Sequence, residues 1–243
     1  MKNNNKSYAN VQLSDFDFLV AQATKAPSGH NTQPWLFKQT NSSIEIHPDF
    51  TRKLPAVDPS NRELFVSLGC AAENLCLAAN SKGYKAAVSV DDGTGAITVS
   101  LTKRSVEADP LFVQIDRRQT NRSVYSGKEI PSEILNKLQS VHPEKDVEIH
   151  FYQKNTTAFN DIAAYIFEAN ELQMQNEAFK SELKSWMRFN KKHQDQTYDG
   201  LSYAVFGAPN VPRFIAEVVM SAAINAKSQN KADRKKITSS SHL

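Results

Sequence analysis

One stretch of the sequence gathers hydrogen-bonding side chains on a turn. Residues 26–35 read Ala-Pro-Ser-Gly-His-Asn-Thr-Gln-Pro-Trp, and their proline and glycine residues interrupt the helical pattern that precedes them. Four side chains of this turn carry polar groups: Ser28, His30, Asn31 and Gln33. Such a turn can offer backbone and side-chain donors to a flat ligand with polar edges, with Trp35 as a wall. The alternative, from these residues alone, is a turn closed by its own polar side chains.

A second stretch, residues 117–122, has the composition of a phosphate site. It reads Arg-Arg-Gln-Thr-Asn-Arg, so Arg118 and Arg122 are spaced by four and the hydroxyl of Thr120 lies between them. Guanidinium groups form paired hydrogen bonds with phosphate oxygens, and a hydroxyl adds a further donor. The competing interpretation is a basic turn in solvent, which is the usual fate of such a run.

The other reactive residue types are not arranged for catalysis. The histidines are scattered without ligand spacing, so we expect no metal site. Cys70 and Cys76 fall on one expected helix at a spacing that fits neither Cys-x-x-Cys nor a disulfide, and we interpret both as small buried hydrophobic residues. The sequence therefore identifies no catalytic residue.

Helices and strands must position these stretches. Apolar periodicity predicts a helix from Leu13 to Ala23 with Ser14 as its N-cap, and a long helix from Ser60 to near Gly83. Short β-type runs predict two hairpins, with strands at residues 36–37 and 44–46, and at 85–90 and 96–102.

The rest of the chain predicts more helices than strands. We expect helices at residues 110–118, 132–138, 156–189 and 214–226, and one strand at 147–152. The glycine-punctuated stretch 199–209 is either a mobile loop over a site or a plain connection.

The bulk composition is that of a soluble globular protein. The chain has 243 residues, 40% of them hydrophobic and 23% charged, which allows one large domain or two small ones. A net charge of +3 is too small to argue for nucleic acid, although it suits an anionic ligand. The most apolar stretches, 68–79 and 214–226, are shorter than the roughly 20 residues that span a bilayer. We therefore expect a cytoplasmic protein without nucleic-acid or membrane partners.

Residues 26–35 resemble the Ala-Pro-Ser-x-x-Asn-x-Gln-Pro-Trp signature of the FMN-dependent nitroreductase superfamily. Residues 118–122 resemble its Arg-x-Ser-x-Arg motif with threonine in place of serine, and residues 69–83 resemble its long Asn-Leu-x-Leu-Ala-Ala helix. The resemblance implies a nitroreductase-like α+β fold, with a mostly antiparallel sheet flanked by helices. It also implies FMN as cofactor and electron transfer from NAD(P)H to a nitro compound, quinone or similar small acceptor. The alternative is a protein that binds or sequesters flavin with little turnover.

The resemblance further implies one cofactor-binding set. The arginine motif would bind the phosphate, and the turn would lie along the ring and ribityl edges. The whole set is Pro27, Ser28, His30, Asn31, Gln33, Arg117, Arg118, Thr120 and Arg122. Within this set Gln33 would orient the turn. His30 remains open between a hydrogen-bonded structural residue and a proton donor.

The order of the two motifs is the reverse of that in the usual homodimeric nitroreductase. We infer a single nitroreductase-like domain over residues 1–243, in which a first half of about 8–108 and a second half of about 109–243 form an intrachain pseudo-dimer. This arrangement resembles the mycobacterial Acg branch, whose members are fused monomers with a lid over the flavin. Relative to the family we expect the second half to be incomplete at its C-terminus. Either this is a trimmed or interrupted version that forms a monomeric pseudo-dimer, or a second chain completes the sheet in a homodimer.

Overall fold

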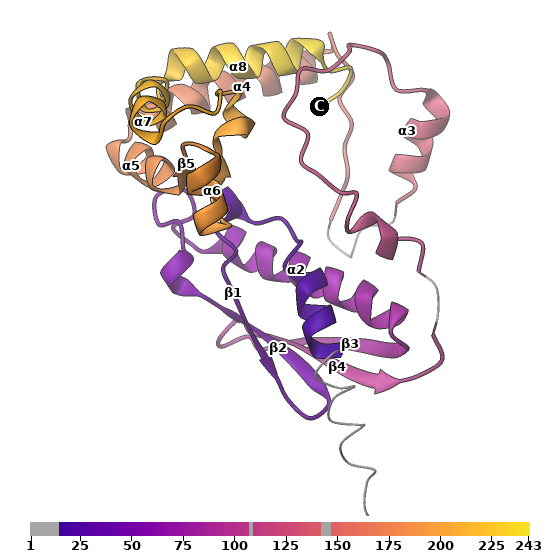
Figure 1. Cartoon of the computed structure of the whole chain (residues 1–243). Helices are drawn as coiled ribbons and strands as arrows, with labels where there is room; N and C mark the ends of the chain where they lie inside the picture. The colour runs from indigo at the N-terminus through magenta and orange to yellow at the C-terminus, as the bar shows by residue number, and fades with distance from the viewer. Residues whose placement is uncertain (1–14, 107–108, 142–146) are drawn as a thin grey trace, which may run out of the picture. The chain divides into compact units, whose positions relative to one another are not determined.

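A computed structural model describes residues 15–106, 109–141 and 147–243 of the chain (Figure 1). Ser14, the expected N-cap of the first helix, lies outside the described residues. The chain divides into two compact units. Unit 1 comprises Met1–Gln119 and Ser185–Ser202, and unit 2 comprises Thr120–Lys184 and Tyr203–Leu243.

A four-stranded antiparallel sheet runs through unit 1, in the order β1-β2-β4-β3. Its strands are β1 (Trp35–Gln39), β2 (Ser43–Pro48), β3 (Tyr84–Val90) and β4 (Ile97–Lys103). Ile44 and Ile46 of β2 point to the buried face together with Ile97 and Val99 of β4, because successive side chains of a strand alternate between faces. Both predicted hairpins are thus confirmed.

Helix α2 (Arg62–Ser81) covers the buried face of this sheet (Figure 1). Its apolar stripe recurs every three or four residues, and its members are fully or nearly fully buried: Leu64, Leu68, Ala71, Leu75 and Ala78. Within the described part of the chain, α2 is the one helix whose length and composition would let it cross a membrane. The central helix of a globular unit has the same length and composition, and α2 packs against the sheet as such a helix does. The predicted helix from Ser60 to Gly83 is confirmed.

Unit 2 is built mainly from helices. These are α3 (Ser132–Gln139), α4 (Thr157–Gln175), most of α5 (Glu177–Trp186), η4 (Tyr203–Phe206), α7 (Arg213–Ala222) and α8 (Ala226–Ser239). A small core forms where α4 packs against α8, and it contains Phe159, Ala163 and Ile237. With the sheet of unit 1, these helices make the α+β architecture that the sequence predicts.

Three local predictions, one in unit 1 and two that begin in unit 2, are wrong. The helix expected over 156–189 breaks at Asn176, whose side-chain oxygen accepts a hydrogen bond from the Phe179 N–H (3.2 Å) and starts α5. The helix expected over 110–118 is one 3-10 turn, η3 (Phe112–Gln114). The strand expected over 147–152 joins no ladder among the described residues, although Tyr152 and Leu243 exchange backbone hydrogen bonds of 2.8 and 2.9 Å.

Unit 1 also takes in a segment distant in sequence. Met187–Arg188 (β5) pairs in parallel with Leu201–Ser202 (β6), and α6 (Lys191–Thr197) lies between them in the chain. The described helical residues 15–23 bury Leu19 and Ala23 in the core of the same unit.

Two glycines of the β3–β4 turn provide a stability test of this fold. A methyl group on Gly95, whose φ is +69°, would stand 2.2 Å from a ring carbon of Phe65 on α2, whereas one on Gly93 would meet nothing closer than 3.5 Å. We expect Gly95→Ala to lower the free energy of unfolding by about 3 kcal/mol, because it adds left-handed strain and displaces a packed ring. Gly93→Ala should change it by less than about 0.5 kcal/mol in urea titrations. Equal stabilities of the two variants would contradict this packing.

Candidate functional site

The turn at residues 26–35 has a strained backbone. Its short helix η1 (Gly29–Asn31) contains His30 at φ 47° and Asn31 at φ 54°, and Gln33 follows at φ 53°. A left-handed conformation costs a non-glycine residue roughly 1–2 kcal/mol. Within the turn, Ser28 Oγ accepts a hydrogen bond from the Gln33 N–H (2.9 Å). A strained backbone persists only where contacts from the surrounding structure stabilise it.

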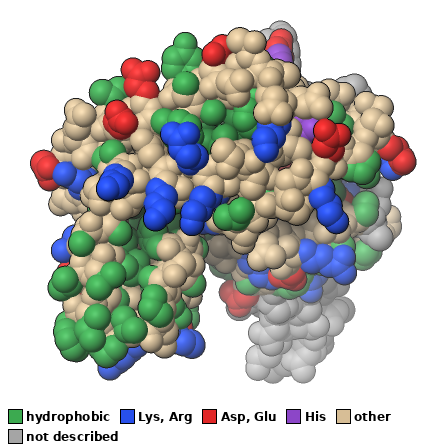
Figure 2. Space-filling view, turned by 90° about the horizontal axis from the view of Figure 1, so that it is seen from above, with side chains coloured by type: hydrophobic (Ala, Val, Ile, Leu, Met, Phe, Trp, Pro, Cys, Tyr) green, Lys and Arg blue, Asp and Glu red, His purple; other side chains and the backbone are tan. Residues whose placement is uncertain are grey.

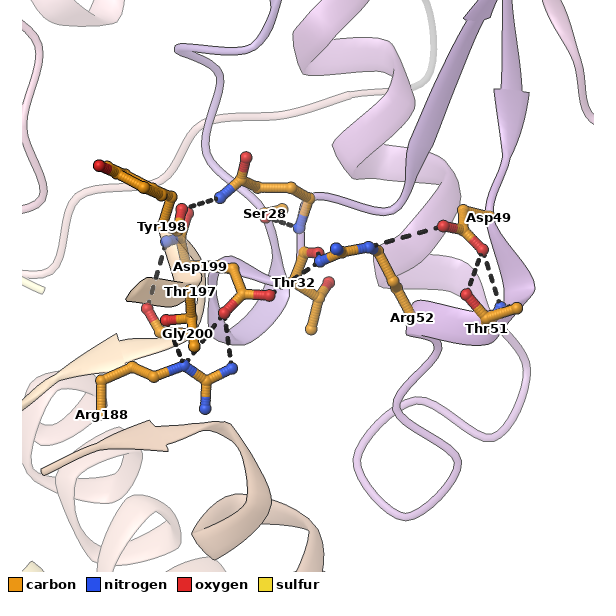
Figure 3. Close-up of polar contacts among 12 residues, drawn as sticks. Ser28, Thr32, Asp49, Thr51, Arg52, Arg188, Thr197, Tyr198, Asp199 and Gly200 are labelled. Atoms are coloured by element: carbon orange, nitrogen blue, oxygen red, sulfur yellow. Dashed lines mark hydrogen bonds and ion pairs between the residues drawn. The ribbon is translucent and has the colours of Figure 1, made fainter. Parts of the chain in front are cut away.

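Those contacts come from residues 198–200 (Figure 3). The Asn31 side-chain amide donates to the Gly200 carbonyl (3.2 Å), and the Gly200 N–H donates to the Asn31 carbonyl (3.0 Å). Gln33 Nε2 donates to the Tyr198 carbonyl (2.7 Å). Two amides that the sequence assigned to a ligand thus bind the main chain of a segment more than 160 residues away in sequence.

An ion-pair cluster fixes this segment in turn. Asp199 lies between two guanidinium groups: Arg188 Nη2 is 2.6 Å from its Oδ1, and Arg52 Nη1 is 3.0 Å from its Oδ2 (Figure 3). Arg52 Nη1 also donates to the Thr32 carbonyl (2.9 Å), which makes it a direct link between the turn and Asp199. The Arg188 and Asp199 side chains are 8% and 13% exposed, so water screens this pair little.

The surroundings of Asp199 keep it ionised. Burial opposes its negative charge, but the hydrogen bonds and charges of Arg188 and Arg52 outweigh that effect and hold the pKa of the Asp199 carboxyl below its ordinary value. Gly200 completes the arrangement. At its φ of +76°, a Cβ atom would come within 2.5 Å of the Trp186 carbonyl and 2.7 Å of the Arg188 guanidinium.

Arg118 lies at the entrance of the turn, in the same unit. Its Nη2 donates to the carbonyl of Lys25 (3.2 Å), the residue directly before the turn. The Lys25 ammonium pairs with Asp116 at 2.5 Å, which fixes the start of the arginine stretch in the same place. Arg117 and Arg118 are exposed. The structure thus brings the first arginine of the 118–122 motif to the turn.

Thr120 and Arg122 are also exposed and belong to unit 2, so their part in a shared site stays a prediction. Pro27 lies within the turn as expected. His30 has its ring Nδ1 buried, and its role also stays a prediction. The expected wall, Trp35, is instead buried in the core of unit 1 and packs beside Phe37.

The donor set of this region fits a phosphate group. A guanidinium carries five N–H donors, and one nitrogen of Arg118 is used on Lys25 while the side chain remains exposed. Asn31 and Gln33 each use one side-chain donor on residues 198–200, so their amide oxygens and second N–H groups are what they can offer a ligand. Anion binding at Arg118 therefore needs no rearrangement of the turn.

Among the described residues, the Cys, His and acidic side chains do not form a second reactive centre. Burial and the neighbouring Glu73 raise the pKa of the Cys76 thiol to about 11, so it stays protonated at neutral pH. In the described ranges, no three His, Cys, Asp or Glu side chains converge on a point that could hold a metal ion.

The comparisons with known proteins point to one class. No protein-family model matches the chain. The chain is similar to two curated proteins of Mycobacterium tuberculosis strains, named "Putative NAD(P)H nitroreductase MT3217" and "Putative NAD(P)H nitroreductase Rv3131". Each is 33% identical over 119 residues, which is 46% of this chain and 35% of the relative. The chain thus spans about a third of the length of the curated relatives it matches, and its distant, partial homology supports the nitroreductase superfamily.

Local sequence patterns do not identify Arg52, Arg188 and Asp199 as partners. One signal was present: Arg188 interrupts the apolar run Trp186-Met187-Arg188-Phe189. A charge inside such a run is buried only when it is paired. The sequence gives no means of choosing Asp199 as that partner.

Removing the Asp199 carboxylate should loosen unit 1. Asp199→Ala leaves the buried Arg188 charge without its carboxylate, and we expect a loss of about 3 kcal/mol in the free energy of unfolding. The matched control is Asp195→Ala, which breaks the Lys191–Asp195 pair of the same 2.6 Å length but with side chains 65% and 50% exposed. Its cost should be below about 0.5 kcal/mol in chemical denaturation, and similar losses for both variants would refute the buried cluster.

The same carboxylate should make unit 1 acid-sensitive. Because the pKa of Asp199 is lower in the folded than in the unfolded chain, its stabilisation is present above the unfolded value and is lost as the pH falls through the folded value. We expect Asp199→Asn to remove part of the acid-dependent fall in melting temperature that the wild-type chain shows below about pH 4. Parallel curves for the two proteins would contradict an ionised, paired Asp199.

Proposed function

We propose that this protein is an FMN-binding oxidoreductase of the nitroreductase type, which transfers electrons from NAD(P)H to a nitro compound, a quinone or a similar small acceptor. The observation that carries the proposal is the position of Arg118. Its exposed guanidinium is hydrogen-bonded to Lys25, 93 residues away in sequence, at the entrance of the polar turn. The partial similarity to two proteins named as NAD(P)H nitroreductases supports the same reaction class.

In this proposal the chain supplies binding and orientation. Arg118, with Arg117 beside it and with Thr120 and Arg122 of the same motif, holds the phosphate as a charged, multiply donating group. The turn at Pro27 to Gln33 lies along the ring and ribityl edges, where Asn31 and Gln33 contribute their remaining amide atoms. These residues would hold and orient FMN, and the bound flavin would supply the redox chemistry between NAD(P)H and the acceptor.

The nitroreductase-like fold and the internal pseudo-dimer belong to this proposal too. The order of the two motifs supports an Acg-like fusion of halves at about 8–108 and 109–243, whereas the two compact units divide the chain differently, with Ser185–Ser202 in unit 1. In this view the protein is cytoplasmic and builds one composite flavin site, either within one chain or with a second chain.

A second candidate is flavin binding with little turnover. It is favoured by the engagement of Asn31 and Gln33 with residues 198–200, which holds the turn in place and occupies one side-chain donor of each amide. A rigid, partly covered turn suits retention of a cofactor more than repeated access by two substrates. The two candidates share the same cofactor and differ in reduction by NAD(P)H.

An FMN titration tests the proposed phosphate ligand. We expect Arg118→Ala to weaken FMN binding at least about tenfold, since a charge-assisted hydrogen bond contributes roughly 1.5–3 kcal/mol. The control is Arg104→Ala, which removes the same charge after β4, where Arg104 binds Asn80. Flavin fluorescence quenching measures both dissociation constants. Equal affinities for the two variants and the wild type would show that Arg118 does not bind the cofactor. If the wild-type protein binds no FMN, the proposed function is wrong.

Anaerobic addition of NADPH or NADH to the FMN-loaded protein separates the two candidates. Bleaching of the flavin absorbance, followed by its return when a quinone is added, supports the oxidoreductase. A colour that persists for hours supports storage.

A further inference from the structure

Tyr198 carries an exposed aromatic side chain on a strained backbone. The residue is 80% exposed, more than any other large hydrophobic residue in the described ranges. It follows α6 with φ 55° and ψ 16°, in the left-handed region, which bulky residues rarely adopt. Helices that end in this conformation usually have glycine there, and sometimes asparagine, because other side chains add strain. Neither the backbone nor the packing of the folded chain therefore favours a tyrosine at position 198.

Hydrogen bonds fix the main chain of Tyr198 on both sides. Its N–H donates to the Gln194 carbonyl (2.9 Å), and its carbonyl accepts from Gln33 Nε2 (2.7 Å). The next two residues, Asp199 and Gly200, are held by ion pairs and hydrogen bonds within the same unit. The ring thus stands on a preorganised backbone, and ordering it against a ligand costs only the freedom of two side-chain torsions.

This backbone places Tyr198 beside the turn that the proposed function assigns to the flavin ring. Gln33, which binds the Tyr198 carbonyl, belongs to that turn. Figure 3 shows the Tyr198 side chain projecting away from the cluster of Arg188, Asp199 and Arg52, so this cluster does not hold the ring. A flat ring system along the turn can stack on such a side chain, because offset aromatic rings attract one another and bury apolar surface.

We propose that the Tyr198 ring stacks on the isoalloxazine of bound FMN and covers one of its faces. The inference rests on the proposed function and adds a contact residue that lies in neither of the two motifs. The strain at Tyr198 is tolerated because the contact between its ring and the cofactor offsets it in the bound state.

Variants at position 198 separate the ring from the backbone. Tyr198→Asn removes the ring and fits the left-handed conformation, and we expect it to weaken FMN binding about fivefold. Tyr198→Phe keeps a ring and should stay within about twofold of the wild type. Ultrafiltration, with the free flavin measured by its absorbance, gives the dissociation constants.

The matched control for these variants is Tyr165→Asn. It removes a tyrosine that is 69% exposed on α4 of unit 2, and it should leave the FMN affinity within about twofold of the wild type. Similar affinities of Tyr198→Asn and the wild type would overturn the contact. An equal loss in Tyr165→Asn would overturn it too, because the effect would then not be specific to position 198.

The fluorescence of bound FMN distinguishes a stacked ring from an indirect effect on the turn. A phenol in contact with an excited flavin quenches its emission by donating an electron, and a phenyl ring does so far less. We therefore expect Tyr198→Phe to bind FMN with nearly wild-type affinity but to emit several times more strongly per bound flavin. Equal emission from the two proteins would contradict the stacking.

A basic surface of unit 2 makes a probe without a phosphate necessary. Figure 2, which views the molecule from the side that α8 occupies in Figure 1, shows several Lys and Arg side chains gathered on that face. The exposed cations of α8 are Lys227, Lys231, Arg234 and Lys235. Clustered positive charge attracts the phosphate of FMN without a specific site.

Riboflavin has the ring of FMN and no phosphate, so its binding reports on the ring contact alone. Tyr198→Asn should weaken the binding of riboflavin and of FMN by the same factor, whereas Arg118→Ala should weaken the binding of FMN and leave that of riboflavin within about twofold. Equal riboflavin affinities of Tyr198→Asn and the wild type would overturn the stacking.

The stability of the protein without flavin tests the strain separately. Tyr198→Asn relieves a left-handed tyrosine and should raise the midpoint of urea unfolding, although it weakens FMN binding. A lowered midpoint would show that the ring stabilises the folded chain itself, and would overturn the proposal. If the wild-type protein binds no FMN, the proposed function and the stacking fail together. If NADPH reduces bound FMN while Tyr198→Asn keeps the wild-type affinity, only the stacking fails.

Discussion

The carboxylate of Asp199, bonded on both sides by guanidinium groups, is the interaction on which the candidate site depends. The turn at residues 28–33 places three non-glycine residues in a left-handed conformation, which an isolated peptide would not hold. The contacts that offset this strain come largely from residues 198–200 and from Arg52. Asp199 binds Arg52 directly and binds the buried Arg188, so the turn, the loop after β2 and the segment after α6 form one cooperative unit.

This dependence changes the meaning of the polar side chains in the turn. From their types alone, Asn31 and Gln33 are equally suited to bind a ligand or the main chain, and in the structure they bind the main chain. What they offer a cofactor is a rigid backbone and their remaining amide atoms. Preorganisation of this kind lowers the entropic cost of binding and favours a cofactor that stays in place. Arg118, in contrast, is exposed and is positioned by a single bond to Lys25, as suits a residue that receives an anionic group from solvent.

Local patterns in the sequence predict most of unit 1. The alternation of Ile44 and Ile46, the stripe from Leu64 to Ala78, and the two polar turns each specify an element without knowledge of distant residues. Prediction of secondary structure fails where a residue distant in sequence determines the conformation of a segment. Residues 147–152 have strand composition but join no ladder among the described residues, where Tyr152 exchanges backbone hydrogen bonds with Leu243. Met187–Arg188 leaves a helical pattern because Leu201–Ser202 pairs with it.

The site divides in the same way. The Pro and Gly residues of the turn predict its position in the chain, and the spacing of Arg118 and Arg122 predicts a phosphate site. The pairing of Arg52 with Asp199 spans 147 residues, and no local pattern encodes it. Trp35 illustrates the converse error, because a large aromatic residue beside a polar turn can serve either a ligand or the core, and here the core of unit 1 takes it.

Hydrogen–deuterium exchange with and without FMN tests the central claim most directly, because it reports on the turn and its support at once. The account predicts that FMN slows exchange in peptides covering residues 26–35, 116–119 and 197–202 together, since Gln33 of the turn is bonded to Tyr198 and Arg118 is bonded to Lys25, directly before the turn. Protection confined to other parts of the chain, or bound FMN that leaves all three peptides unchanged, would contradict it.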